Sequence, residues 1–194
     1  MPVAKYKPLF LIGLLLALAS CERPSPPAAI EAGKATFNLT SYLQGQRQKL
    51  EADKPMVLKS VATQGREPEV VETMDVDWED ELAVFEEADL SRPSMQEYYT
   101  RQEQQLEDGS VAVAYTKRED AEPQVHFLRL VLGPDGKLRQ LNASLQDQNI
   151  IFFSRRTIEL HADPQTGDLS GYSVLGVQKM IFGDSLRYEV KANL

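Results

Sequence analysis

The 194-residue sequence predicts an α+β domain: a large, twisted antiparallel β-sheet, connected as a meander, with two helices packed on one face. Three observations predict it. Apolar residues recur at helical spacing in two segments before residue 90. From about residue 95 the apolar pattern has a period of two, which is typical of strands. Turn signals such as Pro134-Asp135-Gly136 separate most of these segments, and short connections join antiparallel neighbours.

The first helix is expected to begin after Asn38, whose side chain can cap it. Phe37 and Tyr42 occupy the two positions of a hydrophobic staple around that cap. An apolar stripe follows at helical spacing, formed by Leu39, Leu43 and Leu50. Pro55 cannot continue a helix, so we expect the helix to end before it.

A β-hairpin is expected next, with arms at residues 56–63 and 69–76 around the turn 64–68. The second helix is predicted over residues 77–89, with Asp77 as its cap. Its apolar face is formed by Trp78, Leu82 and Phe85, and most of its acidic residues lie off that face. The segment 90–93 ends in proline and breaks the helix.

Seven strands are predicted near residues 96–105, 110–118, 123–132, 137–147, 150–161, 169–181 and 185–192. The segment 126–132 is apolar on both faces, so we expect it to form a covered central strand. Because the connections between consecutive strands are short, these strands should follow one another across the sheet as a meander.

The N-terminus carries the signals of export. Lys5 and Lys7 precede an apolar run from Leu9 to Leu18. A basic start, a short apolar segment and small residues before a cleavage point are typical of a secretory signal peptide. The run is too short for a membrane span, which needs about 20 apolar residues. Leu18-Ala19-Ser20-Cys21 resembles a bacterial lipobox, and Cys21 is the only cysteine of the chain.

The lipobox resemblance implies that residues 1–20 are a lipoprotein signal peptide, that Cys21 receives a diacylglyceryl thioether, and that its new amine is acylated. Two or more acyl chains give stable attachment at about 0.8 kcal/mol per buried CH₂. Residues 21–35 then form the lipidated cysteine and a proline-rich tether, which acts as an extended spacer. In proteobacteria, Glu22 in place of an aspartate favours the outer membrane. We expect a lipid-anchored protein of the bacterial cell envelope whose single α+β domain, residues 36–194, lies in the periplasm.

The net charge and the cysteine content limit the classes of partner that we expect. The chain carries a formal net charge of −8, which becomes −10 when the signal lysines are removed. A protein this acidic repels nucleic acid and anionic headgroups, so we expect no nucleic-acid partner. A disulfide within the chain is excluded because there is no second cysteine. The expected partners are the membrane, through the lipid anchor, and an envelope protein or a lipid.

No catalytic or cofactor-binding motif is present. The chain has no G-x-S-x-G elbow, no Walker loop and no G-x-G-x-x-G turn. Its two histidines, His126 and His161, fall on different predicted strands and lack the spacing of a zinc site. The acidic residues of segment 77–89 do not form a calcium loop, so a solvated helix face is expected. We therefore predict a non-catalytic protein without a metal or cofactor.

Two further patterns suggest binding or modification. Polar residues alternate along the strand 137–147, and tyrosines lie on nearby strands; these are Gln140, Asn142, Ser144 and Gln146, with Tyr98, Tyr99, Tyr115 and Tyr172. Such groups suit a sugar or peptide site, and they equally suit a solvated sheet face. Asp184-Ser185-Leu186 resembles the short O-glycosylation motif of some Bacteroidota, which would place a glycan on Ser185.

The stretches FNLTSYLQ and VDWEDELAVF resemble uncharacterised envelope lipoproteins such as the small ones of Bacteroidota. This resemblance implies a membrane-anchored lipoprotein whose activity is most simply that of a binding or assembly module. One alternative is a carrier of a lipid or another hydrophobic ligand, since a curved sheet with helices on one face is similar in outline to the periplasmic lipoprotein-carrier fold. The other alternative is a structural accessory subunit of an envelope complex. The first requires an apolar cavity, and the second an exposed apolar patch or an open edge strand.

Overall fold

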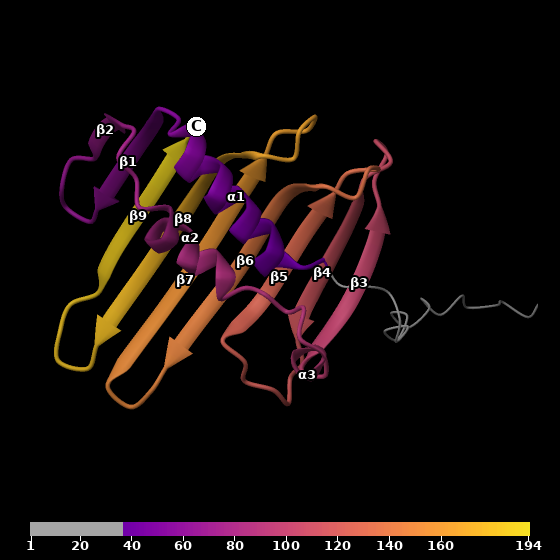
Figure 1. Ribbon diagram of the computed structural model, residues 1–194. Helices are drawn as coiled ribbons and strands as arrows, with labels where there is room; N and C mark the ends of the chain where they lie inside the picture. The colour runs from indigo at the N-terminus through magenta and orange to yellow at the C-terminus, as the bar shows by residue number, and fades with distance from the viewer. Residues whose placement is uncertain (1–36) are drawn as a thin grey trace, which may run out of the picture.

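A computed structural model describes residues 37–194 of the chain (Figure 1). The predicted signal peptide, the lipobox, Cys21 and the tether lie outside these residues. The described residues form one open sheet with three helices, which confirms the predicted α+β class. No helix in this part of the chain is long and apolar enough to cross a membrane.

The sheet has nine antiparallel strands in the order β2-β1-β9-β8-β7-β6-β5-β4-β3. The strands are β1 Val57–Thr63, β2 Glu69–Thr73, β3 Tyr99–Gln105, β4 Val111–Lys117, β5 Val125–Leu132, β6 Leu138–Gln148, β7 Phe152–Ala162, β8 Leu169–Met180 and β9 Leu186–Asn193. From β3 to β9 the chain is the predicted meander, because period-two segments and tight turns leave only antiparallel neighbours.

The first helix, α1, spans Leu39–Asp53 and begins as the sequence predicts. The Asn38 side chain accepts a hydrogen bond from the Ser41 amide at 2.8 Å. The rings of Phe37 and Tyr42 lie 5.9 Å apart, which confirms the hydrophobic staple. The three predicted leucines of the stripe are buried, and the helix ends just before Pro55.

The second helix, α2, spans Trp78–Glu86, and the Asp77 side chain caps it by accepting from two backbone amides. Its predicted apolar face is buried against the sheet, with Phe85 meeting Tyr172 edge to face at 5.7 Å between ring centroids. A carboxylate of this helix, Glu81, accepts a hydrogen bond from the Tyr172 hydroxyl and pairs with Lys59. The expectation of a fully solvated acidic face is therefore wrong for Glu81.

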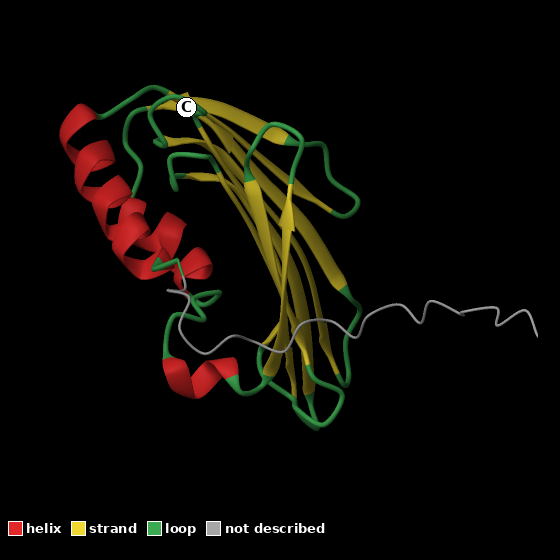
Figure 2. Cartoon of the chain, turned by 90° about the vertical axis from the view of Figure 1, so that its right-hand side faces the viewer, coloured by secondary structure: helices red, strands yellow, loops and turns green. Residues whose placement is uncertain are grey.

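The core lies between the helices and one face of the sheet. Figure 2 shows the sheet curving around α1 and α2, with both helices on its concave side. The largest fully buried side chains come from both layers and include Leu39, Leu43, Leu82, Phe85, Tyr99, Tyr115, Leu141, Leu145 and Ile158. The core cluster is built from residues between Leu39 and Ala192. A chain of residues 22–194 therefore keeps every residue of this core cluster.

Three details differ from the prediction. A third, short helix, α3 Pro93–Gln96, follows the predicted break, because proline is tolerated in the first turn of a helix. The hairpin β1–β2 joins the sheet beside β9, with Lys59 opposite Ala192, so it extends the far edge of the meander. Strand β5 is the third from the β3 edge and not central, and no helix covers its second face, where Phe127 and Arg129 are half-buried.

Arg156 of β7 ties α2 to the sheet. Its guanidinium donates a bidentate pair of hydrogen bonds to the Glu87 carboxylate, from Nη1 at 2.8 Å and from Nη2 at 2.7 Å. Nη2 also lies 3.4 Å from a carboxylate oxygen of Asp147. Gln124 donates to the same two carboxylates. The hydrogen bonds that Arg156 donates to Glu87 raise the pKa of Arg156 against the opposing effect of burial. Paired, hydrogen-bonded carboxylates of this kind stabilise a helix end against a sheet.

We expect Arg156→Met to lower the free energy of unfolding by about 1 kcal/mol, because it leaves the carboxylates of Glu87 and Asp147, whose side chains are 34% and 43% exposed, without their cation. Urea unfolding followed by circular dichroism measures the change. The matched control is Arg155→Met, since Arg155 is the exposed neighbour on the opposite face of the strand. That control should change stability by less than about 0.5 kcal/mol. Equal effects of the two substitutions would contradict the contact.

Candidate binding pocket

An apolar pocket of about 360 Å³ opens on the concave face of the sheet, over β3, β4 and β5. We call it the β3–β5 pocket. Its apolar wall consists of Phe37, Val111, Val113, Leu130 and Leu132. Cross-strand register explains this wall, because Val113 lies opposite Leu130 and Val111 lies opposite Leu132, and directly opposed residues point to one face.

The pocket exists because the helices do not reach this end of the sheet. In Figure 1, α1 and α2 lie over the strands between β5 and β9, and β3 and β4 extend beyond them. Under α2 the space is filled by Trp78, Leu82 and Phe85, which are buried. Beyond the start of α1 the same apolar sheet face continues, and among residues 37–96 of the described chain only Phe37 lines it. A hollow is left where the second layer ends.

The wall of the β3–β5 pocket contains one ion pair, Arg101 with Glu103. Arg101 of β3 donates from Nε to the Tyr115 hydroxyl at 3.2 Å and forms an ion pair with Glu103. The guanidinium also lies over the Tyr115 ring, 5.9 Å from its centroid. Burial lowers the pKa of Arg101, but the hydrogen bonds to Glu103 and Tyr115 outweigh it and raise the pKa overall. The pair is internally neutral, so it adds polarity without net charge.

Two tight turns form the rim of the pocket. Gly109, in the turn between β3 and β4, and Gly136, between β5 and β6, adopt positive φ angles of 81° and 77°. Residues with side chains adopt this conformation rarely, so glycine is favoured there. Asp108 accepts hydrogen bonds from the amide and hydroxyl of Ser110, each at 3.0 Å, which lowers its pKa. Turns fixed in this way give the pocket a firm edge.

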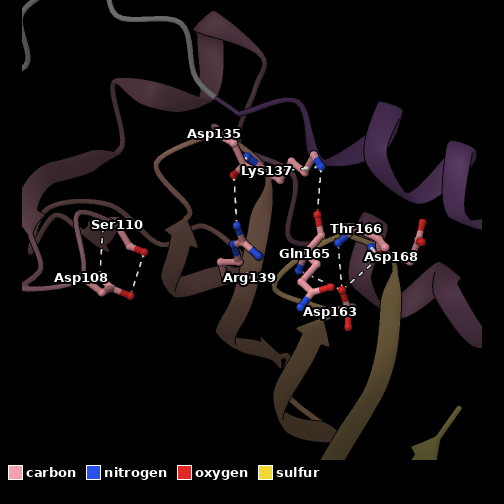
Figure 3. A network of polar contacts seen from close by, with 9 residues as sticks. All are labelled: Asp108, Ser110, Asp135, Lys137, Arg139, Asp163, Gln165, Thr166 and Asp168. Atoms are coloured by element: carbon pink, nitrogen blue, oxygen red, sulfur yellow. Dashed lines mark hydrogen bonds and ion pairs between the residues drawn. The ribbon is translucent and has the colours of Figure 1, made fainter.

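A third turn, between β7 and β8, continues the row at this end of the sheet (Figure 3). Asp163 accepts from the amides of Gln165 and Thr166, each at 2.8 Å, and these bonds lower its pKa. Lys137 of the neighbouring turn donates to the Gln165 carbonyl at 3.1 Å. Asp135 of that turn accepts a hydrogen bond from Arg139 of β6 at 3.2 Å. The β5–β6 and β7–β8 turns are thus joined by a hydrogen bond, and the β3–β4 turn lies at the same end of the sheet.

The same row of turns positions α1. The Tyr42 hydroxyl donates to the Gly167 carbonyl at 3.1 Å, and Gln46 accepts from the Leu169 amide at 2.8 Å. Lys49 pairs with Asp168 at 2.6 Å, which lowers the pKa of Asp168. These contacts hold the helix across the sheet and place Phe37, just before its first turn, at the mouth of the pocket.

The chemistry of the pocket lining is mainly that of an apolar binding surface. The walls are aliphatic, and the one charged pair is neutralised internally. Among the described residues there is no cluster of three or more potential metal ligands. His126 and His161 lie on β5 and β7, apart from this pocket, and burial lowers the pKa of His126. A narrow apolar group is the ligand that these walls would accept.

The polar residues singled out in the sequence do not form one site. Strand β6 turns Gln140, Asn142, Ser144 and Gln146 to the convex face, because they alternate with buried residues on the concave face. Tyr99, Tyr115 and Tyr172 are buried on the concave face, and Tyr98 is exposed beside α3. The combined sugar or peptide site is therefore wrong, since the two sets lie on opposite sides of the sheet. Ser185 is exposed in the β8–β9 turn, and its glycosylation stays a prediction.

Sequence reasoning missed the pocket. Val111, Val113, Leu130 and Leu132 carry the ordinary pattern of a buried strand face, and nothing local shows that no helix covers them. The turn glycines and Arg101 were the available signals, because an arginine among aliphatic residues of a strand face needs a partner there. Comparison of the chain with protein-family models, with curated proteins and with solved structures finds no significant match.

Proposed function

We propose that the protein is an envelope lipoprotein, anchored through Cys21, whose domain is a non-catalytic binding module for a hydrophobic ligand. The observation that supports the ligand is the β3–β5 pocket: an apolar hollow of about 360 Å³ with firm turns at its rim. Ligand pockets in proteins range from about 300 to 1,000 Å³ and are mainly apolar. A volume near the lower end suits one acyl chain or one narrow ring, and not a whole phospholipid.

The Arg101–Glu103 ion pair in the pocket wall further limits the class of ligand. Because Arg101 is already paired with Glu103, an anionic headgroup would have to displace a carboxylate to reach it. A neutral ligand leaves the pair intact, and its polar atoms can hydrogen-bond to either partner. We therefore infer that the pocket favours an uncharged lipid or a neutral apolar compound.

A test is to titrate the chain of residues 22–194 with N-phenyl-1-naphthylamine, a neutral dye whose fluorescence increases in apolar surroundings. We expect saturable binding at one site. Val111→Trp fills the pocket from a half-buried wall position and should weaken dye binding at least tenfold while the circular dichroism spectrum stays native. Native mass spectrometry of the same chain, purified from a periplasm, then identifies any lipid that it carries.

The matched control is Gln102→Trp, which adds the same side chain to the exposed convex face of β3. It should bind the dye as the unmodified chain does. If Val111→Trp and Gln102→Trp bind equally well, or the unmodified chain does not bind, the pocket is not a ligand site.

A second candidate is an accessory subunit of an envelope complex, and one observation favours it. Strand β2 is an edge of the sheet, and Val70 and Val71 on it are exposed. Open edge strands with apolar side chains can pair with another chain. Crosslinking in intact envelopes from a photoreactive residue at Val70 tests this: a defined protein adduct supports the subunit, and its absence removes it.

A further inference from the structure

Two neighbouring hairpins end in exposed apolar side chains. Ile150, in the β6–β7 turn, is 92% exposed, and Phe182, in the β8–β9 turn, is 97% exposed. The Ile181 amide donates to the Ile151 carbonyl at 3.0 Å, so the two turns lie in contact. Figure 1 shows both turns at the same end of the sheet. We call this surface the apolar tip; it consists of Ile150, Ile151, Met180, Ile181 and Phe182.

The fold does not need these side chains. They lie beyond the core cluster, and each is more than half exposed. A hairpin turn of this kind normally carries polar residues or glycine. Single exposed apolar residues are common, but five on two touching turns form a contiguous patch. An apolar patch on an exposed surface indicates a contact with a protein or a membrane.

The charges around the apolar tip distinguish these partners. Residues 146–155 and 177–187, the parts of the two hairpins from the level of Arg155 to the turns, contain three cations, Arg155, Lys179 and Arg187, and two anions, Asp147 and Asp184, whereas the whole chain is at −8. Register places Arg155 and Arg187 on either side of Val177, in one row across three strands. Within the described part of the chain, neither Lys179 nor Arg187 has an ion-pair partner. The two hairpins therefore carry one net positive charge on an acidic protein, and two of their cations, Arg155 and Arg187, stand in one row.

The spacing of these groups matches a bilayer surface. At about 3.3 Å per residue, Arg155 stands roughly 13 Å above the Ile151 end of its hairpin. Interfacial apolar side chains enter about 5–10 Å below the headgroup boundary. With Phe182 and Ile150 at that depth, the row of cations lies at the level of the phosphates. Exposed aromatic and aliphatic side chains below a row of basic residues are typical of proteins that lie in the membrane interface.

We propose that the apolar tip docks the domain onto a membrane that contains anionic lipid, by inserting Phe182 and Ile150 into the interfacial region. The tether allows it to reach the membrane that would hold Cys21. Sixteen residue steps from Cys21 to Phe37 span up to about 55 Å, and the longest strand, β8 with 12 residues, spans roughly 40 Å. The docking surface stands apart from the β3–β5 pocket and does not require the lipid anchor.

The test measures co-sedimentation of residues 22–194 with vesicles of 70% phosphatidylethanolamine and 30% phosphatidylglycerol. The unmodified chain should partition at least tenfold more strongly into these vesicles than into pure phosphatidylcholine, because each cation near an anionic surface contributes on the order of fivefold. The double variant Phe182→Ser with Ile150→Ser should lose at least tenfold in partitioning. The matched control, Val70→Ser with Leu175→Ser, removes two exposed apolar side chains away from the tip and should bind as the unmodified chain does.

Insertion of the apolar tip into the bilayer can be measured separately by fluorescence. The only tryptophan, Trp78, is buried in the core, so Phe182→Trp adds a reporter at the tip. Brominated lipid should quench this reporter and leave a Leu175→Trp reporter unquenched. The proposal is overturned if the unmodified chain does not sediment with anionic vesicles, if the tip variant sediments equally well, or if the tip substitutions alter only self-association. Dye binding by the tip variant is expected to stay normal, which separates this outcome from that of the pocket.

Discussion

Phe85→Ala is expected to lower the free energy of unfolding by about 4 kcal/mol. Phe85 is fully buried, at 0% exposure, and its ring meets that of Tyr172 edge to face. Removing the ring forfeits its transfer from water and leaves a cavity between α2 and the sheet, because the two layers can collapse only partly. Domains of this size have stabilities of about 5–15 kcal/mol, so this single change removes a large share.

Urea unfolding followed by far-ultraviolet circular dichroism measures the effect. Val84→Ala is the matched control on the same helix, since Val84 is only half-buried, and it should cost about 1 kcal/mol or less. Phe85→Leu keeps most of the volume and should cost clearly less than the alanine change. A loss below about 1 kcal/mol for Phe85→Ala would mean that α2 does not pack on the sheet as described.

Much of the fold could be predicted because its signals are local. Asn38 with Phe37 and Tyr42 marks the start of α1, and the structure shows both the cap and the staple. Asp77 marks the start of α2, and the structure shows its side chain capping the helix. The strands follow from alternation and the turns from their glycines, which act within a few residues of one another. Boundaries of the seven predicted strands differ from the observed ones by at most about three residues.

The parts that could not be predicted depend on distant contacts. The hairpin β1–β2 joins β9 through pairs such as Lys59 with Ala192, and no local pattern specifies that partner. The β3–β5 pocket depends on where α1 lies across the sheet, which the pair Lys49–Asp168 and the Tyr42–Gly167 hydrogen bond determine. The two sequence stretches of the apolar tip, NIIFF and KMIFG, fall at the ends of predicted strands, because the sequence alone does not distinguish an apolar turn from an apolar strand end.

Raising the pH above 10 is expected to unfold the domain cooperatively. Burial raises the pKa of Tyr99 to about 12. Burial also raises the pKa of Tyr42 and Tyr172 above that of a free tyrosine, with a smaller contribution from Asp168 and Glu81 respectively. Each hydroxyl donates a hydrogen bond in the fold, to Gly167, Val125 or Glu81, that a phenolate cannot make. The folded chain therefore keeps three protons that the unfolded chain releases near pH 10.

Proton linkage determines whether stability rises or falls with pH. A group whose pKa is raised in the fold stabilises it fully below the unfolded pKa, and that stability is lost as pH rises toward the folded pKa. Each tyrosine contributes a slope of up to about 1.4 kcal/mol per pH unit, so three contribute up to about 4. Over two pH units this approaches the whole stability of a domain of this size. The transition should fall between about pH 10 and 12, where the unfolded tyrosines ionise and the folded ones do not.

Two signals recorded on one sample test this: far-ultraviolet circular dichroism for the fold and absorbance at 295 nm for tyrosinate. We expect the three buried tyrosines to ionise together with unfolding and not before it. Tyr172→Phe removes one linked proton, so the pH dependence of stability above pH 10 should become shallower by up to a third. Complete ionisation of every tyrosine near pH 10 with a native circular dichroism spectrum would show that these hydroxyls are not held in the core. The core would then lack the Tyr172–Glu81 contact, which joins the sheet to α2.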